Sequence, residues 1–358
     1  MKRILIILGN GFTIDFLQKY SQWKKSDINI DVRNLFKYGE GVITPWDERP
    51  GFLSYKHCPN LWMLGARPNL TCAESNALIE EIISCANMFF DFVMDDEKRL
   101  KRIKMISASD TNIHLKAYKE LIMYLGCLFN AYNNYITDED IKDFVNESNE
   151  WGWLKVFKDL KKHTEVYLDV ITFNYDIWLE RVLKACEIKY TIGAFDKSEA
   201  KVRIYKPHGS ISFFKKDSNE EQFRVNYQLN IEGIGIEQLT VSEEIDKKNC
   251  SSIIIPPAGE AERLKQIAPW ASIIESEAIK SIRQMDQNKN NLVIMCGLSY
   301  WHVDRREIDQ LLVNIDEETE FILINPSPPR DLNAVLSSIF KNYVLQTSAD
   351  NLGGIFYG

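Results

Sequence analysis

The sequence has no apolar run long enough to cross a membrane, because none reaches the roughly 18 residues that a transmembrane helix needs. The apolar run near the amino end, residues 4–8, is too short for a secretion signal. It also ends at Gly9-Asn10-Gly11 rather than at a small-residue cleavage site. We therefore expect a cytoplasmic protein that does not bind a membrane.

The sequence also lacks paired cysteines. Its seven cysteines are odd in number, and no two form a Cys-x-x-Cys pair. This usage is typical of a reduced, cytoplasmic protein. His57, Cys58 and Cys72 lie near one another, but their spacing matches no zinc-ligand pattern, so we predict no metal site.

An excess of positive charge is missing as well. The chain has 43 Lys and Arg against 51 Asp and Glu, which gives a net charge of −8. Binding to nucleic-acid phosphates depends on clustered Lys and Arg, so we expect no direct contact with nucleic acid. With 358 residues, of which 45% are hydrophobic, the chain can bury a large core without disulfides or a structural metal.

Short continuous apolar runs alternate with helical patterns and predict an α/β fold with a mostly parallel, Rossmann-like sheet. We expect buried strands at residues 4–8, 166–173, 252–255, 292–296 and 321–324, and a helix at 302–313. Residues 73–163 have apolar residues at helical spacing and predict an inserted helical module. Residues 23–70 are interpreted as a long irregular loop that covers a site, and 213–229 as a hairpin.

Five short motifs place polar residues or glycines where predicted strands end. They are Gly9-Asn10-Gly11 with Thr13, Asn174-Tyr175-Asp176, His208-Gly209-Ser210, Gly297 with Ser299, and Asn325. Open α/β sheets bind ligands at the carboxyl ends of their strands, so these residues are expected to meet at one edge. Glycines at a strand-to-helix turn also let a diphosphate approach the helix N-terminus.

Each motif also has a structural alternative. Gly9-Asn10-Gly11 suits any tight strand-to-helix turn, and Ile14 occupies the position of the third glycine in the dinucleotide fingerprint. Asp176 is equally suited to capping a helix. His208, held between Pro207 and Gly209, is placed as a general base, whereas the other four histidines are interpreted as structural.

The order of these motifs resembles the sirtuin-like superfamily. It is most similar to the bacterial sirtuin-like NAD-consuming proteins of antiphage defence and to abortive-infection proteins whose first motif begins Gly-Asn-Gly-Phe. The resemblance runs from about residue 4 to residue 326 but is confined to the motifs. It implies one sirtuin-like NAD-binding domain over residues 1–358, with residues 73–163 as a helical insertion.

The resemblance also implies roles for single residues. Asn174 and His208 would be catalytic, Asn174 holding the nicotinamide ribose and the attacking water and His208 acting as the base. The residues placed against NAD are Gly9, Asn10, Gly11, Thr13, Asp15, Asp176, Gly297, Ser299 and Asn325.

Two departures separate this chain from deacylating sirtuins. Cys250 is the only cysteine between Ser210 and Met295, so the two Cys-x-x-Cys pairs of the zinc ribbon are missing. Phe173 stands where those enzymes have Gln before the Asn, and Ile14-Asp15-Phe16-Leu17 replaces their Ile-Pro-Asp-Phe-Arg segment. Asp15 either replaces a missing active-site group or caps a helix.

These features predict a gated NAD+ hydrolase that depletes NAD in antiphage defence, with NAD+ as its substrate and no metal cofactor. Because an unrestrained hydrolase would deplete its own cell, we expect a separate sensor subunit, self-assembly into a homo-oligomer, or both. Two alternatives remain open. One is a sirtuin-type protein deacylase or ADP-ribosyltransferase, and the other is a non-catalytic module that binds NAD or ADP-ribose.

Overall fold

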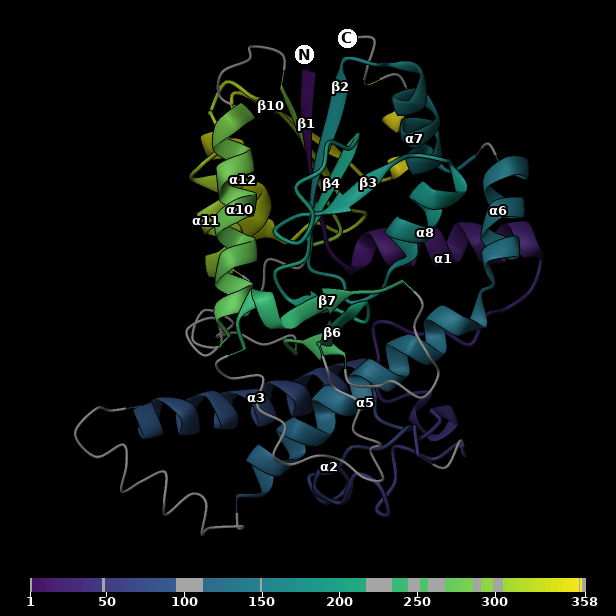
Figure 1. Ribbon diagram of the computed structural model, residues 1–358, viewed down its shortest axis with the longest axis vertical. Coiled ribbons are helices and arrows are strands. Elements are labelled where there is room, and N and C mark those ends of the chain that lie inside the picture. The colour runs from purple at the N-terminus through teal and green to yellow at the C-terminus, as the bar shows by residue number, and fades with distance from the viewer. Residues whose placement is uncertain are drawn as a thin grey trace.

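The computed structural model describes residues 2–46, 49–94, 112–148, 150–216, 234–243, 252–256, 268–285, 291–298, 305–353 and 355. Seven parallel strands form the central sheet in the order β11-β10-β9-β1-β2-β4-β3 (Figure 1). Their bounds are β1 Lys2–Leu8, β2 Val166–Thr172, β3 Tyr190–Ile192, β4 Val202–Tyr205, β9 Leu292–Cys296, β10 Glu320–Ile324 and β11 Asn342–Gln346. The predicted α/β fold with a Rossmann-like, mostly parallel sheet is confirmed.

The sheet changes its direction of growth between β1 and β9. From β1 the chain adds β2, β4 and β3 on one side, and then returns to add β9, β10 and β11 on the other. Such a switch point leaves a crevice at the carboxyl ends of the two strands, where ligands of open α/β sheets bind. The last five residues of β1 are buried, as expected for a central strand covered on both faces.

Helices cover both faces of the sheet (Figure 1). One side carries α10 (Pro269–Met285), α11 (Arg305–Leu312) and α12 (Arg330–Ile339), and the other carries α1 (Asn10–Lys24), α7 (Gly152–Lys162) and α8 (Trp178–Ala185). Phe16 fixes α1 by ring contacts with Phe144, Trp151 and Trp178 at 5.6 to 5.9 Å. These contacts pack the first two turns of α1 against α6 (Asp138–Glu147), α8 and the residue before α7.

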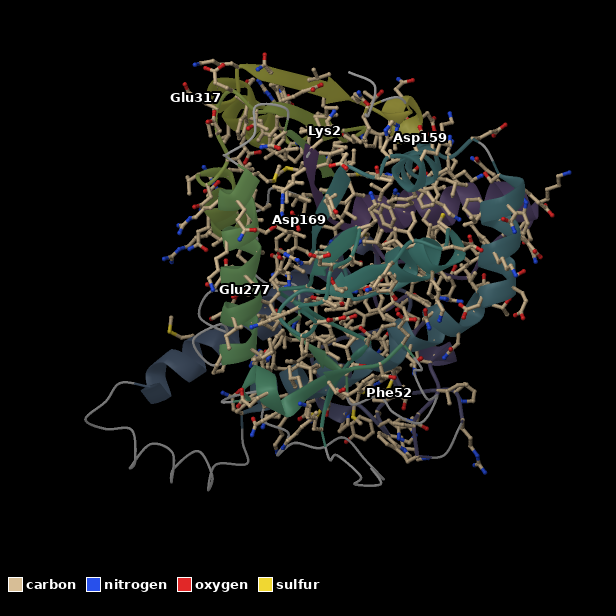
Figure 2. The ribbon with its side chains drawn as sticks, turned by 45° about the horizontal axis from the view of Figure 1, so that its top comes forward. Lys2, Phe52, Asp159, Asp169, Glu277 and Glu317 are labelled. Atoms are coloured by element: carbon tan, nitrogen blue, oxygen red, sulfur yellow. The ribbon has the colours of Figure 1, made fainter. Side chains whose placement is uncertain are left out.

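A second group of helices lies beyond the carboxyl ends of the strands (Figure 1). It contains α2 (Pro59–Met63), α3 (Cys72–Met94) and α5 (Ile113–Tyr135), with both α2 and α3 packed against α5. Figure 2 shows Phe52 at this end of the molecule and Lys2 at the opposite end. The rest of the predicted insertion returns to the sheet, because α6 (Asp138–Glu147) packs against α8 and α7 packs against the short helix η3 (Ala349–Leu352).

One expected strand has a different partner from the one predicted. Residues 252–255 are not part of the parallel sheet: β8 (Ile253–Ile254) pairs antiparallel with β5 (Gly209–Ser210). A short buried apolar run does not specify its partner, which is why the prediction was wrong. The strand β6 (Phe213–Lys215) pairs antiparallel with β7 (Leu239–Val241). The turn at 217–219 and the second strand of the expected hairpin lie outside the described residues, so the hairpin stays a prediction.

The sequence analysis did not predict the strands β3, β4 and β11. Both β3 and β4 are short, and β11 is an edge strand with mostly exposed residues, so none has a long apolar run. Cys127 is disulfide-bonded, so the prediction of fully reduced cysteines is wrong there, while Cys58, Cys72, Cys85, Cys186 and Cys296 are free. No helix in the described ranges has both the length and the apolar character needed to cross a bilayer.

Candidate functional site

A cavity of about 850 Å³ lies at the carboxyl ends of β1, β2, β9 and β10. Its volume is within the roughly 300–1,000 Å³ typical of small-molecule sites. The predicted site residues that line it are Gly9, Asn10, Gly11, Asp15, Asn174, His208, Gly297 and Asn325. Thr13 and Asp176 are not among its lining residues, and Ser299 lies outside the described part of the chain.

Three glycines bring the β1–α1 turn and the residues directly after β9 into backbone contact. The Gly9 amide donates to Cys296 O at 3.0 Å, and the Gly11 amide donates to Gly297 O at 3.1 Å. A Cβ on Gly11 would lie 2.2 Å from the Cα of Gly297, closer than any side chain permits. These contacts support the structural role of the glycines, because both amides already donate within the protein.

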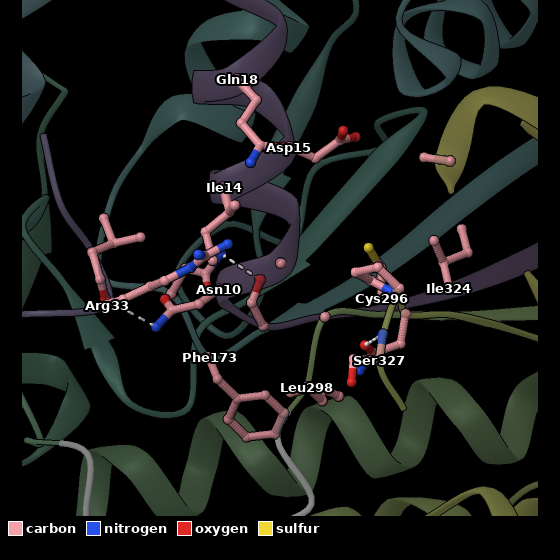
Figure 3. A pocket seen from close by; sticks show the side chains of 18 of the residues that line it. Asn10, Ile14, Asp15, Gln18, Arg33, Phe173, Cys296, Leu298, Ile324 and Ser327 are labelled. Atoms are coloured by element: carbon pink, nitrogen blue, oxygen red, sulfur yellow. Dashed lines mark hydrogen bonds between the residues drawn. The ribbon is translucent and has the colours of Figure 1, made fainter. Parts of the chain in front are cut away.

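Asn10 begins α1 and lies at one side of the cavity. In Figure 3, Asn10 and Arg33 lie together at this side, while Asp15 and Gln18 lie further along α1. The positive end of the α1 dipole and the Arg33 guanidinium therefore act at the same place. Within the described residues no ion pair of Arg33 is found, so its charge is available to an anionic ligand.

The carboxamide of Asn174 is held in a single orientation. Its Nδ2 donates to Gly9 O and to Thr13 Oγ1, both at 3.0 Å. A primary amide has two N–H donors, and both are used here. The carbonyl Oδ1 is therefore the polar atom that Asn174 can offer to a ligand in the cavity it lines.

A buried polar network holds Thr13, one of the two hydrogen-bond partners of Asn174 Nδ2, in place. The Thr13 hydroxyl donates to Asp176 Oδ2 at 2.7 Å, and Lys206 Nζ donates to Asp176 O and to Glu180 Oε1. Burial raises the pKa of Asp176 to about 6, although the Lys206 charge and the Thr13 hydrogen bond oppose this shift. Asp176 Oδ1 also accepts from the Trp178 amide at 3.3 Å, which favours its structural role at the start of α8.

His208 pairs with a carboxylate that the sequence analysis did not identify. Its Nε2 lies 2.6 Å from Glu307 Oε2, and both side chains are almost completely buried. The Phe173 ring meets the imidazole edge-on at 4.9 Å, and Gly209 turns the chain directly after it with a φ of +80°. An ionised Glu307 accepts from Nε2, and a neutral imidazole that donates there has its lone pair on Nδ1.

Asp15 lies on the cavity wall one turn into α1. Its Oδ2 accepts from Trp151 Nε1 at 2.8 Å, and burial raises the pKa of the carboxyl, while that hydrogen bond and the charge of Lys19 oppose the rise. Because Gly9 is the N-cap of α1, Asp15 does not cap this helix. The alternative of a helix cap is therefore wrong, whereas contact with a ligand stays a prediction.

Asn325 lies at the end of β10, as expected, and closes a tight turn there. The side-chain Oδ1 of Asn325 accepts from the backbone amide of Ser327 at 2.9 Å. The backbone amide of Asn325 donates to Gln346 O, also at 2.9 Å. These bonds hold its side chain against the far wall of the cavity, which Thr347, Ser348 and Asp350 also line.

The sequence motifs did not point to Arg33, Glu80, Lys19 and Asp350, which line the cavity, or to Glu307, which pairs with His208. Glu307 is on α11 beside His208, Arg33 is in the loop after α1, and Glu80 is on α3. The expectation that residues 23–70 include a cover for the site agrees with the position of Arg33. Neither Glu80 nor Glu307 lies in a motif, so only the folded structure shows that they are close to the other site residues.

No group of three or more His, Cys, Asp or Glu side chains arranged to hold a metal ion is found in the ranges that the structure describes. The cavity instead combines a fixed amide, a carboxylate-paired imidazole and a cationic side chain. Such a set suits an anionic ligand with hydroxyl groups and a reaction that transfers a proton to a base.

Two comparisons with known proteins give no family for this chain. No protein-family model matches the sequence, and no curated protein was found to be similar to it.

Proposed function

We propose that this protein hydrolyses the N-glycosidic bond of NAD+, releasing nicotinamide and ADP-ribose. The observation that carries the proposal is the meeting of Asn174 and His208 in one cavity at the switch point of the sheet. These two residues follow different strands, and the cavity also contains the β1–α1 turn. The motif order that resembles NAD-consuming proteins therefore corresponds to one site in space.

The fixed residues suit the chemistry of this bond. The C1′–N bond breaks with its electron pair going to nicotinamide, which leaves as a neutral molecule and needs no proton from the protein. The ribose passes through an oxocarbenium-like transition state, and a water oxygen bonds to C1′. Asn174 Oδ1 accepts a hydrogen bond from this water or from a ribose hydroxyl, which orients the two reactants.

His208 takes the proton that the water loses. Its Nδ1 has the lone pair, and Glu307 stabilises the imidazolium that results, as the carboxylate does in a catalytic triad. A positioned base of this kind contributes roughly 10²–10⁴-fold to the rate. Asn174 and His208 are thus the proposed catalytic residues, and Glu307 is a positioning residue.

The diphosphate is proposed to bind at the amino end of α1. Because the amides of Gly9 and Gly11 donate within the protein, the attraction comes from the α1 dipole and from Arg33 rather than from a full cradle of amides. Lys19 also lines the cavity, but it pairs with Asp350 at 3.0 Å. Gly297 and Ser299 remain proposed contacts for a phosphate or a ribose, and Asn325 remains a proposed contact for the adenosine half.

Chromatography of NAD+ after incubation with the purified chain tests this proposal. We expect the wild type to release nicotinamide and ADP-ribose, below its full rate where the proposed gating holds, and we expect both His208→Ala and Asn174→Ala to be slower than the wild type by roughly 10²-fold or more. His114→Ala and Asn134→Ala are matched controls, because neither residue lines the cavity. Near-normal nicotinamide release by either site variant would remove that residue from the mechanism.

The same assay separates the competing functions. Turnover that requires an acylated peptide would replace hydrolysis by deacylation, and tight NAD+ binding without nicotinamide release would indicate a binding module. We further propose that the hydrolase acts in antiphage defence and is gated by a sensor subunit or by self-assembly. Full activity of the isolated monomer would contradict that gating.

A further inference from the structure

One face of α3 forms a wall of the candidate site. Cys72, Asn76, Ile79 and Glu80 line the cavity, and their spacing places them on the same side of the helix. Because α3 belongs to the helical insertion, this insertion takes part in the site. Its contribution includes an amide from Asn76 and a carboxylate from Glu80, both of which can accept hydrogen bonds.

Glu80 is an unusual residue for such a wall. Its Oε1 is buried and has no hydrogen-bond partner among the described residues, and no ion pair of Glu80 is found there either. A buried acceptor without a partner destabilises the folded state. The neighbouring Glu81 differs, because it is exposed and pairs with His114 Nε2 at 3.3 Å.

A ligand that satisfies Glu80 must bring hydrogen-bond donors and no negative charge to this point. The diol of a ribose fits, because two adjacent hydroxyls donate to the two oxygens of one carboxylate. Arg33 lies beside Asn10 on another wall of the cavity and suits the opposite group, a phosphate (Figure 3). Glu80 and Arg33, for which the described part of the chain offers no ion pair, thus suit different parts of one dinucleotide.

We propose that Glu80 binds a ribose diol of the substrate, so that the helical insertion supplies part of the substrate specificity. This inference rests on the proposed function for the identity of the ligand, but it concerns binding rather than the chemical step. Glu80 is then a specificity-determining residue whose carboxylate is kept in spite of its cost to the free protein.

Binding and stability measured together test the proposal, with ADP and ADP-ribose as probes. In Glu80→Gln we expect the affinity for ADP-ribose, from calorimetry, to fall roughly tenfold or more. The ligand-free Glu80→Gln and Glu80→Met proteins should unfold at the same temperature as the wild type or higher, because each variant removes the charge beside Oε1, a buried oxygen that has no partner among the described residues. Glu81→Gln should leave the affinity unchanged.

The two probes show which ribose is bound. A loss of affinity for both ADP and ADP-ribose assigns the diol to the adenosine ribose, and a loss for ADP-ribose alone assigns it to the other ribose. Unchanged affinity for both probes in Glu80→Gln would overturn the proposal, as would a lowered unfolding temperature in Glu80→Met with no change in affinity.

The same measurements distinguish a failure of this inference from a failure of the proposed function. Unaltered binding by Glu80→Gln alongside normal NAD+ hydrolysis would overturn this inference alone, whereas Glu80-dependent binding without hydrolysis would overturn only the proposed function. Absence of binding by the wild type would overturn both.

Discussion

Replacing Gly297 by alanine should destabilise the fold strongly, because two separate penalties act at this position. The new Cβ would lie 2.1 Å from Gly11 Cα and 2.4 Å from Gly11 N, and neither backbone atom can move without displacing α1. Overpacking of this kind costs about 1–3 kcal/mol. The residue also has a φ of +63°, which costs a non-glycine residue about 1–2 kcal/mol more. We therefore expect Gly297→Ala to lose about 2–5 kcal/mol of unfolding free energy.

Alanine variants of three other glycines measure the close contact and the positive φ separately. Gly11→Ala introduces the close contact, at 2.2 Å from Gly297 Cα, without a positive φ. Gly65→Ala introduces only the positive φ of +104°, and Gly41→Ala introduces neither, since no atom lies within 4 Å of its Cβ. Urea unfolding should therefore rank Gly41→Ala as the least destabilised and Gly297→Ala as the most. If Gly297→Ala were no less stable than Gly65→Ala, the close contact between Gly11 and Gly297 would be refuted.

Two further predictions concern the buried charges near the cavity. Glu307→Gln should retain the fold but lose roughly 10²–10⁴-fold in kcat for nicotinamide release, because the imidazolium of His208 is no longer stabilised. An unchanged kcat and an unchanged pH profile would contradict the role of Glu307. Burial raises the pKa of Asp176 to about 6, above its value in the unfolded chain, so the folded protein keeps this proton to a higher pH. The contribution of Asp176 to stability is therefore fully present below about pH 4 and is lost as the pH rises through about 6. The unfolding free energy of Asp176→Asn, measured across this pH range, should lack that decline. A decline of the same size in both proteins would show that another group causes it.

The sheet was predictable where strands are buried on both faces. Residues 4–8 and 292–296 are continuous apolar runs, and each forms a central strand of the sheet. The edge strand β11 was not predictable, because most of its residues are exposed and it lacks such a run. The prediction of a parallel strand at 252–255 was wrong, because burial alone does not distinguish a parallel from an antiparallel partner.

The candidate site was predictable only as far as strand ends reveal it. Gly9 and Asn174 follow strands with predicted bounds, so the rule for open sheets placed them at one edge. His208 follows β4, whose bounds were not predicted, and it lines the same cavity. Helical residues give no such signal. The sequence pattern of α3 shows that it has a buried face, but not that Glu80 on this face meets a cavity.

The most direct test of the central claim is a crystal structure of His208→Ala with NAD+ bound. The variant lacks the proposed base, so the dinucleotide should remain intact in the crystal. We predict that the nicotinamide ribose lies within hydrogen-bond distance of Asn174 Oδ1, with its anomeric carbon facing the space left by the imidazole. NAD+ bound elsewhere, or bound with this ribose away from Asn174, would contradict the account.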